Sequence, residues 1–237
     1  MQNAGAAMQL ECRDIQFFYP QSANSILDDL SLVLNTPGLH GLFGPSGVGK
    51  TSLAKIMAGT IQPSAGQILT EGLQTILYCH NLERLPGWSS VGRHLERITP
   101  PGKAALKDRL LSQFGLTDCL GRRFGRLSLG QRNRLNLTRY LVQDLQMLIM
   151  DESLANVDEH TRGTILTTVK ELFPNVIFLY ISHNVIEVAR YCNHIWVLRD
   201  RSKRPQAVRI QGMDLHVAEA AGPQALEKTM LEMMNAA

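Results

Sequence analysis

The sequence predicts an α/β fold, in which a parallel β-sheet with crossover helices is interrupted by a helical insertion. Short apolar segments alternate with segments of helical period before residue 80 and after residue 144, whereas residues 91–142 are mostly helical in period. The chain has 237 residues, 44% hydrophobic and 19% charged, which is the composition of an ordinary globular domain. We therefore expect one domain over residues 1–237, with a core from residues 10–79 and 144–211, a helical subdomain at 80–143 and a C-terminal helical tail at 212–237.

The individual elements follow from the apolar spacing and from the residues that interrupt it. Strands are expected at residues 10–18, 31–34, 39–43, 67–70, 75–79, 145–150, 176–181 and 194–198. Helices are expected at residues 50–58, 91–98, 103–114, 129–142, 159–173 and 184–191. Gly59 ends the first helix, and Pro100, Pro101 and Gly102 separate the next two. In the tail, we expect Gly222 and Pro223 to break a helical segment that follows Gly212.

Composition and charge exclude several classes of protein. The net charge of +3 is too small for a dedicated nucleic-acid binder, so no nucleic-acid partner is expected. The basic residues near position 200 are interrupted by Asp200 and are interpreted as a solvated loop between strands. The four cysteines are far apart and predict neither a zinc site nor a disulfide framework. The longest apolar run, residues 176–181, is about a third of the length of a membrane-spanning helix, and residues 1–9 do not resemble a signal peptide.

The strongest motif lies between the third strand and the first helix. Residues 44–51 fit the pattern G-x-x-x-x-G-K-[ST], whose glycines let backbone N–H groups surround phosphate oxygens at a helix N-terminus. The lysine can reach the β- and γ-phosphates, and the threonine hydroxyl can ligate Mg²⁺. A glycine-rich turn with a chance lysine is the alternative, which the strand–loop–helix setting disfavours. The residues expected to bind nucleotide are Gly44, Pro45, Ser46, Gly47, Val48, Gly49, Lys50 and Thr51.

Two carboxylates follow the apolar strand at residues 145–150. Asp151 is expected beside Mg²⁺ together with Thr51, and Glu152 is expected to polarise an attacking water. The alternative is an acidic cap on the next helix, which is a common feature. The phosphate-binding motif upstream favours the catalytic interpretation.

A third motif, Leu-Ser-Leu-Gly-Gln at residues 127–131, precedes an arginine-rich helix. It is close to the LSGGQ signature of the ATP-binding cassette (ABC) ATPases, and with GPSGVGKT and LQMLIMDE in the family's order the sequence is identified as a member. The resemblance implies a P-loop NTPase (RecA-like) core, a small antiparallel β subdomain and an inserted α-helical signature subdomain. It implies that Ser128, Gly130 and Gln131 bind the γ-phosphate of an ATP held by an opposite subunit. Leu129 departs from the first glycine of the pattern.

Three smaller elements support the resemblance. Tyr19 is similar to the aromatic residue that stacks on adenine, although taken alone it is as readily a core residue. His183 follows a strand and is similar to the switch histidine that contacts the γ-phosphate, although a lone histidine after a strand is usually structural. Asp158 is retained in the loop that follows Glu152 in the family, and the resemblance implies that it is one of the residues that bind nucleotide.

One position departs from the family. Where the resemblance implies a glutamine that ligates Mg²⁺, counting back from Leu85 and Pro86 places His80, and imidazole is a poorer Mg²⁺ ligand than an amide oxygen. Either hydrolysis is slowed or made pH-sensitive, or water takes the position and little changes.

The resemblance implies a subunit that binds and hydrolyses ATP to energise an ABC transporter, at the cytoplasmic face of the membrane as a peripheral subunit. It implies a dimer with itself or a homologous subunit, transmembrane permease subunits that dock near residues 80–98 and Trp88, and a possible substrate-binding protein. The order Leu-Pro-(Gly)-Trp weakly resembles importers of the nitrate, sulfonate and taurine type, and an exporter stays open. The alternatives are a soluble ATP-driven switch and a weakly hydrolysing ATP-gated module, the latter motivated by His80.

Overall fold

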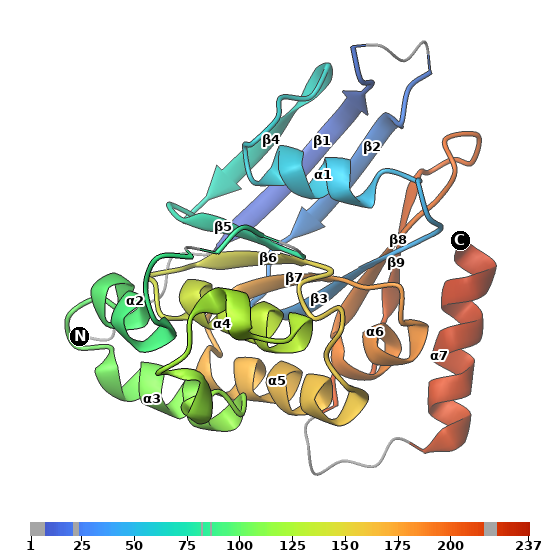
Figure 1. The fold of residues 1–237 in the computed structure, drawn as a ribbon. Helices are drawn as coiled ribbons and strands as arrows, with labels where there is room; N and C mark the ends of the chain where they lie inside the picture. The colour runs from blue at the N-terminus through green and yellow to red at the C-terminus, as the bar shows by residue number, and fades with distance from the viewer. Residues whose placement is uncertain (1–7, 21–23, 82, 86, 216–221) are drawn as a thin grey trace, which may run out of the picture.

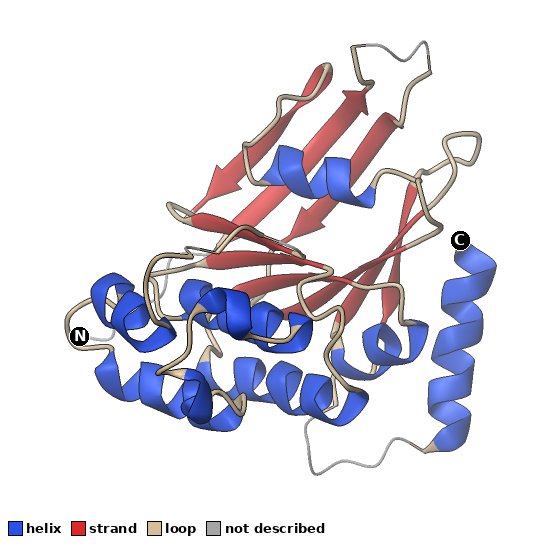
Figure 2. Cartoon of the chain, in the orientation of Figure 1, coloured by secondary structure: helices blue, strands red, loops and turns tan. Residues whose placement is uncertain are grey.

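A computed structural model describes residues 8–20, 24–81, 83–85, 87–215 and 222–237 of the chain. It contains a three-stranded antiparallel sheet and a six-stranded sheet, with helices on both sides of the larger one (Figures 1 and 2). No helix within these ranges is both long enough and apolar enough to cross a bilayer.

The antiparallel sheet has the strand order β2-β1-β4, formed by β1 (Gln9–Phe17), β2 (Leu27–Leu34) and β4 (Ala65–Glu71). It confirms the small antiparallel subdomain that the family resemblance implied. Strand β2 begins four residues before the predicted strand, because the register with β1 continues through an irregularity around Leu30. Asp29, with φ of 57°, lies at that irregularity and breaks the alternation on which the prediction depended.

The larger sheet has the order β5-β6-β7-β3-β8-β9. Its strands are β3 (Gly38–Phe43), β5 (Ile76–His80), β6 (Met147–Asp151), β7 (Ile177–Ile181), β8 (His194–Leu198) and β9 (Ala207–Gln211). All neighbours are parallel except β9, which pairs antiparallel with β8 as the edge strand. Strand β9 was not predicted individually, because its short polar-rich sequence alternates too weakly to stand out.

The central strands are buried on both faces, which explains their continuous apolar sequences. In β7, Ile177, Leu179 and Ile181 point into one core, while Phe178 and Tyr180 point into another. The first core also contains residues of β1 and β2 and the buried face of α1 (Lys50–Met57), so α1 lies between the two sheets (Figure 1). The chain passes from β3 of the larger sheet through α1 to β4 of the antiparallel sheet.

The second core lies under the remaining helices, on the opposite face of the six-stranded sheet (Figure 2). These helices are α2 (Val91–Ile98), α3 (Ala104–Gln113), α4 (Leu129–Leu141), α5 (Glu159–Leu172) and α6 (Val185–Tyr191). Short 3₁₀ turns at Thr117–Cys119 and Phe124–Arg126 connect α3 to α4. The helices of the insertion and those of the sheet crossovers therefore share one apolar core.

The C-terminal helix corrects the prediction for the tail. Helix α7 (Pro223–Ala236) begins at the glycine–proline pair, with Gly222 as its N-cap and Pro223 in its first turn. Proline lacks an N–H and has a fixed φ, so it suits the first turn of a helix and starts this one instead of breaking it. Residues 213–215 are not helical, and the rest of the predicted segment before Gly222 lies outside the described residues. Helix α7 packs on α6 and β9 (Figure 1).

Candidate nucleotide-binding site

The loop between β3 and α1 has the conformation that the motif at residues 44–51 predicts. Gly49 is the N-cap of α1 with φ of 109°, a region that side chains rarely adopt. A Cβ at this position would also lie 2.7 Å from Ile26 Cγ2 and 2.8 Å from Leu27 Cδ2. Backbone conformation and close packing therefore both require glycine here.

Lys50 is buried in the centre of this loop. Its Nζ donates hydrogen bonds to the carbonyl oxygens of Gly44 and Pro45, both at 2.8 Å. Burial lowers the pKa of Lys50, and the nearby carboxylates of Glu152 and Asp151 oppose that shift. The loop thus holds an ammonium group close to its own backbone, where an anion with phosphate oxygens would find it preorganised.

A pocket of about 320 Å³ opens beside the loop, a volume within the range of small-molecule sites. Tyr19 forms one of its walls, and its hydroxyl is hydrogen-bonded to Ser52 Oγ at 3.0 Å. Tyr19 is 43% exposed, and its ring packs edge-on against Phe17 at 5.0 Å between centroids. The lining residues are Tyr19, Ile26, Ser46, Gly47, Gly49, Lys50, Thr51, Ser52, Glu152 and His183.

The carboxyl ends of β6 and β7 bring the predicted catalytic residues together. Asp151 is buried at the end of β6, and Glu152 follows it with φ of 49° and an N–H bonded to Ile181 O at 3.0 Å. His183 Nε2 lies 2.5 Å from Glu152 Oε1, and both side chains line the pocket. A non-glycine residue at positive φ is uncommon, and here it turns the Glu152 side chain toward the pocket.

The residues present fit a magnesium ion. The hydroxyl of Thr51, which lines the pocket, and the buried carboxylate of Asp151 at the end of β6 are hard oxygen donors, which Mg²⁺ prefers. His80 pairs with Asp151 in the strand register, and its role toward Mg²⁺ stays a prediction. Its ring stacks on Tyr78 at 5.4 Å between centroids, and its Nδ1 lies 3.9 Å from Glu83 Oε2.

Sequence reasoning missed Tyr78 as a residue of this site. Its hydroxyl donates a 2.8 Å hydrogen bond to Asp151 Oδ2, and burial with this bond raises the pKa of Tyr78. In the register of β5 and β6, His80 pairs with Asp151 and Tyr78 with Ile149. Tyr78 lies two residues before the end of β5, on the neighbouring strand, so its long side chain can reach the carboxylate of Asp151. This contact can be recognised only when the pairing of β5 with β6 is known.

The loop after β5 is also bound to α4 by a second group of polar contacts that the sequence did not reveal. Glu83 accepts hydrogen bonds from Asn136 Nδ2 at 2.9 Å, Tyr140 Oη at 2.9 Å and Arg139 Nη1 at 3.3 Å. Asn133 Nδ2 bonds Asn81 Oδ1 at 3.0 Å in the same loop. Four donors spaced along one face of α4 thus hold the segment that follows the predicted metal-site position.

The signature residues form the start of α4. Ser128 is its N-cap, and Ser128 and Gln131 exchange hydrogen bonds in a capping box. Gly130 packs so closely that a Cβ would lie 2.5 Å from Asn156 O. None of the three lines the pocket beside the phosphate-binding loop, as far as the described residues show.

Asp158 serves as a helix cap in this structure. Its carboxylate accepts a hydrogen bond from Thr161 N at 2.9 Å at the start of α5, and this bond lowers the pKa of Asp158. The side chain is exposed, so its predicted role toward nucleotide stays a prediction.

Comparisons with known proteins agree with this geometry. The sequence profile described as "ABC transporter" matches residues 27–155. The chain is 30% identical over 195 residues to the Fe(3+) ions import ATP-binding protein FbpC of Photobacterium profundum, covering 75% of this chain and 55% of that protein. It is 32% identical over 208 residues to the molybdenum import ATP-binding protein ModC of Mesorhizobium japonicum, covering 78% of this chain and 56% of that protein.

Two further comparisons bear on length and fold. The ribose import ATP-binding protein RbsA of Halalkalibacterium halodurans is 29% identical over 204 residues, with 76% of this chain and 41% of that protein covered. The chain therefore spans about half the length of the curated relatives that it matches. A bacterial Atm1-family ABC exporter with ATP bound superposes with a TM-score of 0.74 at 18% identity, over 97% of this chain and 42% of the exporter, which is a likeness of fold.

The structure and the profile match agree. The fold contains the phosphate-binding loop, the two acids after β6, the histidine after β7 and the capped signature helix. The chain belongs to the ABC transporter family.

Proposed function

We propose that the chain binds and hydrolyses ATP to energise a transporter, by closing on a second cassette and reopening after hydrolysis. One observation carries this proposal. The pocket is lined by the phosphate-binding loop, Glu152 and His183, whereas Ser128 and Gly130 at the start of α4 are not among its lining residues. A site that needs both groups is complete only when the signature of another copy, or of a homologous subunit, covers the pocket.

The chemistry expected of this chain's residues follows from their positions. Glu152 accepts a proton from the attacking water, and His183, 2.5 Å away, holds the carboxylate in place. Lys50 compensates charge on the phosphates, and Tyr19 stacks on the base. Thr51 and Asp151 would hold Mg²⁺, which supplies charge compensation on the β- and γ-phosphates when bound.

The partner is proposed to be a pair of transmembrane permease subunits, which would hold the chain peripherally at the cytoplasmic face of the membrane. Trp88 is 76% exposed in the segment between β5 and α2, while Leu85 packs against the core and Pro86 lies outside the described residues. An exposed tryptophan on a segment that Leu85 fixes to the core is suited to a protein interface. The three curated relatives named above are import proteins, which favours import and, with it, a substrate-binding protein that delivers cargo.

The substitution Glu152→Gln tests the mechanism. We expect turnover to fall by at least about a hundredfold, equivalent to roughly 2.7 kcal/mol of barrier, while ATP still binds and dimers accumulate. Glu159→Gln, an exposed acid in the first turn of α5, is the matched control and should leave both unchanged. Turnover is measured by phosphate release and association by light scattering with saturating ATP.

Two results would contradict the proposal. Unchanged turnover in Glu152→Gln would show that Glu152 is not the catalytic base. A protein that stays monomeric under saturating ATP would show that the site is not shared between two cassettes. Co-purification from membranes separates the transporter subunit from a soluble ATP-driven switch, since only the former should retain a multi-span partner.

A further inference from the structure

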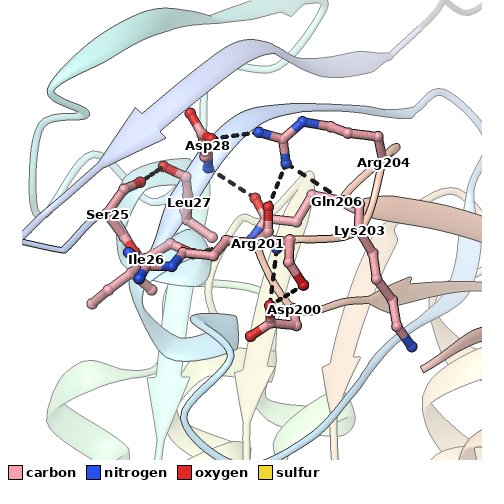
Figure 3. A network of polar contacts seen from close by, with 10 residues as sticks. Ser25, Ile26, Leu27, Asp28, Asp200, Arg201, Lys203, Arg204 and Gln206 are labelled. Carbon is pink, nitrogen blue, oxygen red and sulfur yellow. Dashed lines mark hydrogen bonds and ion pairs between the residues drawn. The ribbon is translucent and has the colours of Figure 1, made fainter.

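The loop between β8 and β9, residues 199–206, lies against the segment at residues 24–28 that leads into β2 (Figure 3). Residues 200–205 are exposed, which confirms the prediction of a solvated loop between strands, and the four basic residues of the loop all have hydrogen-bond partners. Arg199 bonds Pro205 O at 3.2 Å and Lys203 bonds Ala237 O at 2.7 Å. Arg201 and Arg204 instead bind the segment at residues 24–28.

Gln206 makes the central contact of this network. It is fully buried, its Nε2 donates to Ile26 O at 3.0 Å, and its Oε1 accepts from Asp28 N at 2.8 Å (Figure 3). One side-chain amide therefore pairs two backbone groups on either side of Leu27, as a neighbouring strand would. Removing the amide would leave both backbone groups without these partners in a mostly buried place.

The two arginines bind different groups of the segment at residues 24–28. Arg201 donates to Ser25 O at 3.1 Å and to Asn24 Oδ1 at 3.2 Å, so it fixes the backbone just before Ile26. Arg204 forms an ion pair with Asp28, with side chains 49% and 38% exposed. Exposed ion pairs of this kind contribute little, so the fully buried Gln206 makes the strongest of these contacts.

The segment held in this way forms a wall of the nucleotide pocket. Ile26 lines the pocket together with Tyr19, and Ile26 and Leu27 fill the space beside Gly49 of the phosphate-binding loop. The wall is therefore confined between the phosphate-binding loop on one side and the β8–β9 loop on the other. Its position depends on residues almost 180 positions away in the sequence.

We propose that Gln206 and Arg201 are positioning residues of the nucleotide pocket, which set the affinity for ATP by holding Ile26 in its wall. They touch the backbone of the segment at residues 24–28 and act through it. The inference depends on ATP being the ligand of this pocket, and it concerns affinity more than the chemical step, because Glu152 and His183 lie on other elements.

The experiment compares ATP binding by the full chain and its Gln206→Met, Arg201→Gln and Lys203→Gln variants. Methionine keeps the length of Gln206 without either hydrogen bond, and we expect it to raise the ATP dissociation constant about tenfold. Arg201→Gln should raise it about threefold, with kcat at saturating ATP nearly unchanged. Lys203→Gln removes the same charge from the same loop without touching residues 24–28, so its dissociation constant should equal that of the wild type.

The outcomes distinguish positioning from stability and from charge. A lower melting temperature with an unchanged dissociation constant in Gln206→Met would overturn the proposal, and so would equal weakening in Lys203→Gln and Arg201→Gln. If Gln206→Met does not fold, the test uses Arg201→Gln, which changes an exposed residue. A lower melting temperature with an unchanged dissociation constant in that variant would overturn the proposal in the same way. A wild-type chain that binds no ATP would overturn the nucleotide assignment itself, and the inference with it.

Discussion

The bond between Tyr78 and Asp151 shows how a single side chain can orient the carboxylate that we propose to hold Mg²⁺. The hydroxyl donates a hydrogen bond to Asp151 Oδ2 at 2.8 Å, at the end of β6. Hydrogen bonds to charged acceptors stabilise by about 1.5–3 kcal/mol, more than neutral ones. Tyr78 therefore stabilises both the orientation and the charge of the carboxylate that is proposed to hold Mg²⁺.

Replacing Tyr78 with phenylalanine should weaken Mg²⁺ binding. We expect the Mg²⁺ concentration for half-maximal, metal-dependent ATP binding to rise about tenfold, because a bond to a charged carboxylate is lost. The measurement is a Mg²⁺ titration of ATP binding followed by fluorescence. Tyr140→Phe is the matched control, since that hydroxyl bonds Glu83 on α4 instead of Asp151. An equal shift in both variants, or in neither, would contradict this role.

At the scale of elements, the start of α4 is fixed against the loop after β6. Gly130 allows the helix to approach the carbonyl of Asn156, and the capping box of Ser128 and Gln131 fixes the direction of its first turn. The contacts of Glu83 hold the same helix further along. The signature turn is thus positioned by packing on both sides, as a surface that must meet a second subunit requires.

Introducing a methyl group at Gly130 should displace this turn. Because the Cβ would lie 2.5 Å from Asn156 O, backbone has to move, and we expect a loss of stability of about 1–3 kcal/mol. In the Glu152→Gln background, Gly130→Ala should also reduce the ATP-dependent dimer. Gly125→Ala is the control, since a Cβ there meets no atom within 4 Å. Thermal unfolding and light scattering measure the two effects, and dimers at the parental level would argue against a displaced signature turn.

At the scale of the whole molecule, three histidines couple stability to pH. Burial lowers the pKa of His40, His94 and His194. The unfolded chain binds protons at these residues below about pH 6.5, whereas the folded chain does so only at lower pH, so stability is lost as the pH falls below that value. His94 is the clearest case, because neither ring nitrogen has a hydrogen-bond partner among the described residues.

Replacing His94 with phenylalanine should reduce this acid sensitivity. The ring packs edge-on against Phe124 at 5.3 Å between centroids, and an aromatic ring without nitrogens keeps that contact. We expect a smaller fall in melting temperature between pH 7.5 and pH 5.5 than in the wild type, since the unfolded state loses a proton-binding group. His160→Gln, at an exposed position on α5, is the comparison. A slope equal to that of the wild type would show that His94 does not contribute.

Much of the fold and of the site could be predicted because its signals are local. The phosphate-binding loop, Asp151 with Glu152, and the signature turn each occupy a few consecutive residues next to a strand or a helix start, and each lies where it was expected. Strand β9 and the start of α7 could not be placed, since an edge strand alternates weakly and a glycine–proline pair can end a helix or begin one.

The sequence by itself determined the α/β alternation, the family and the candidate phosphate-binding residues, because apolar period and motif spacing are properties of neighbouring residues. The tertiary structure alone decided that Tyr78 contacts Asp151, that Glu83 binds α4 and that Gln206 holds the pocket wall. These partners are 73, 53 and 180 residues apart, respectively. A contact across such a separation depends on strand order and register, which the pattern of neighbouring residues does not encode.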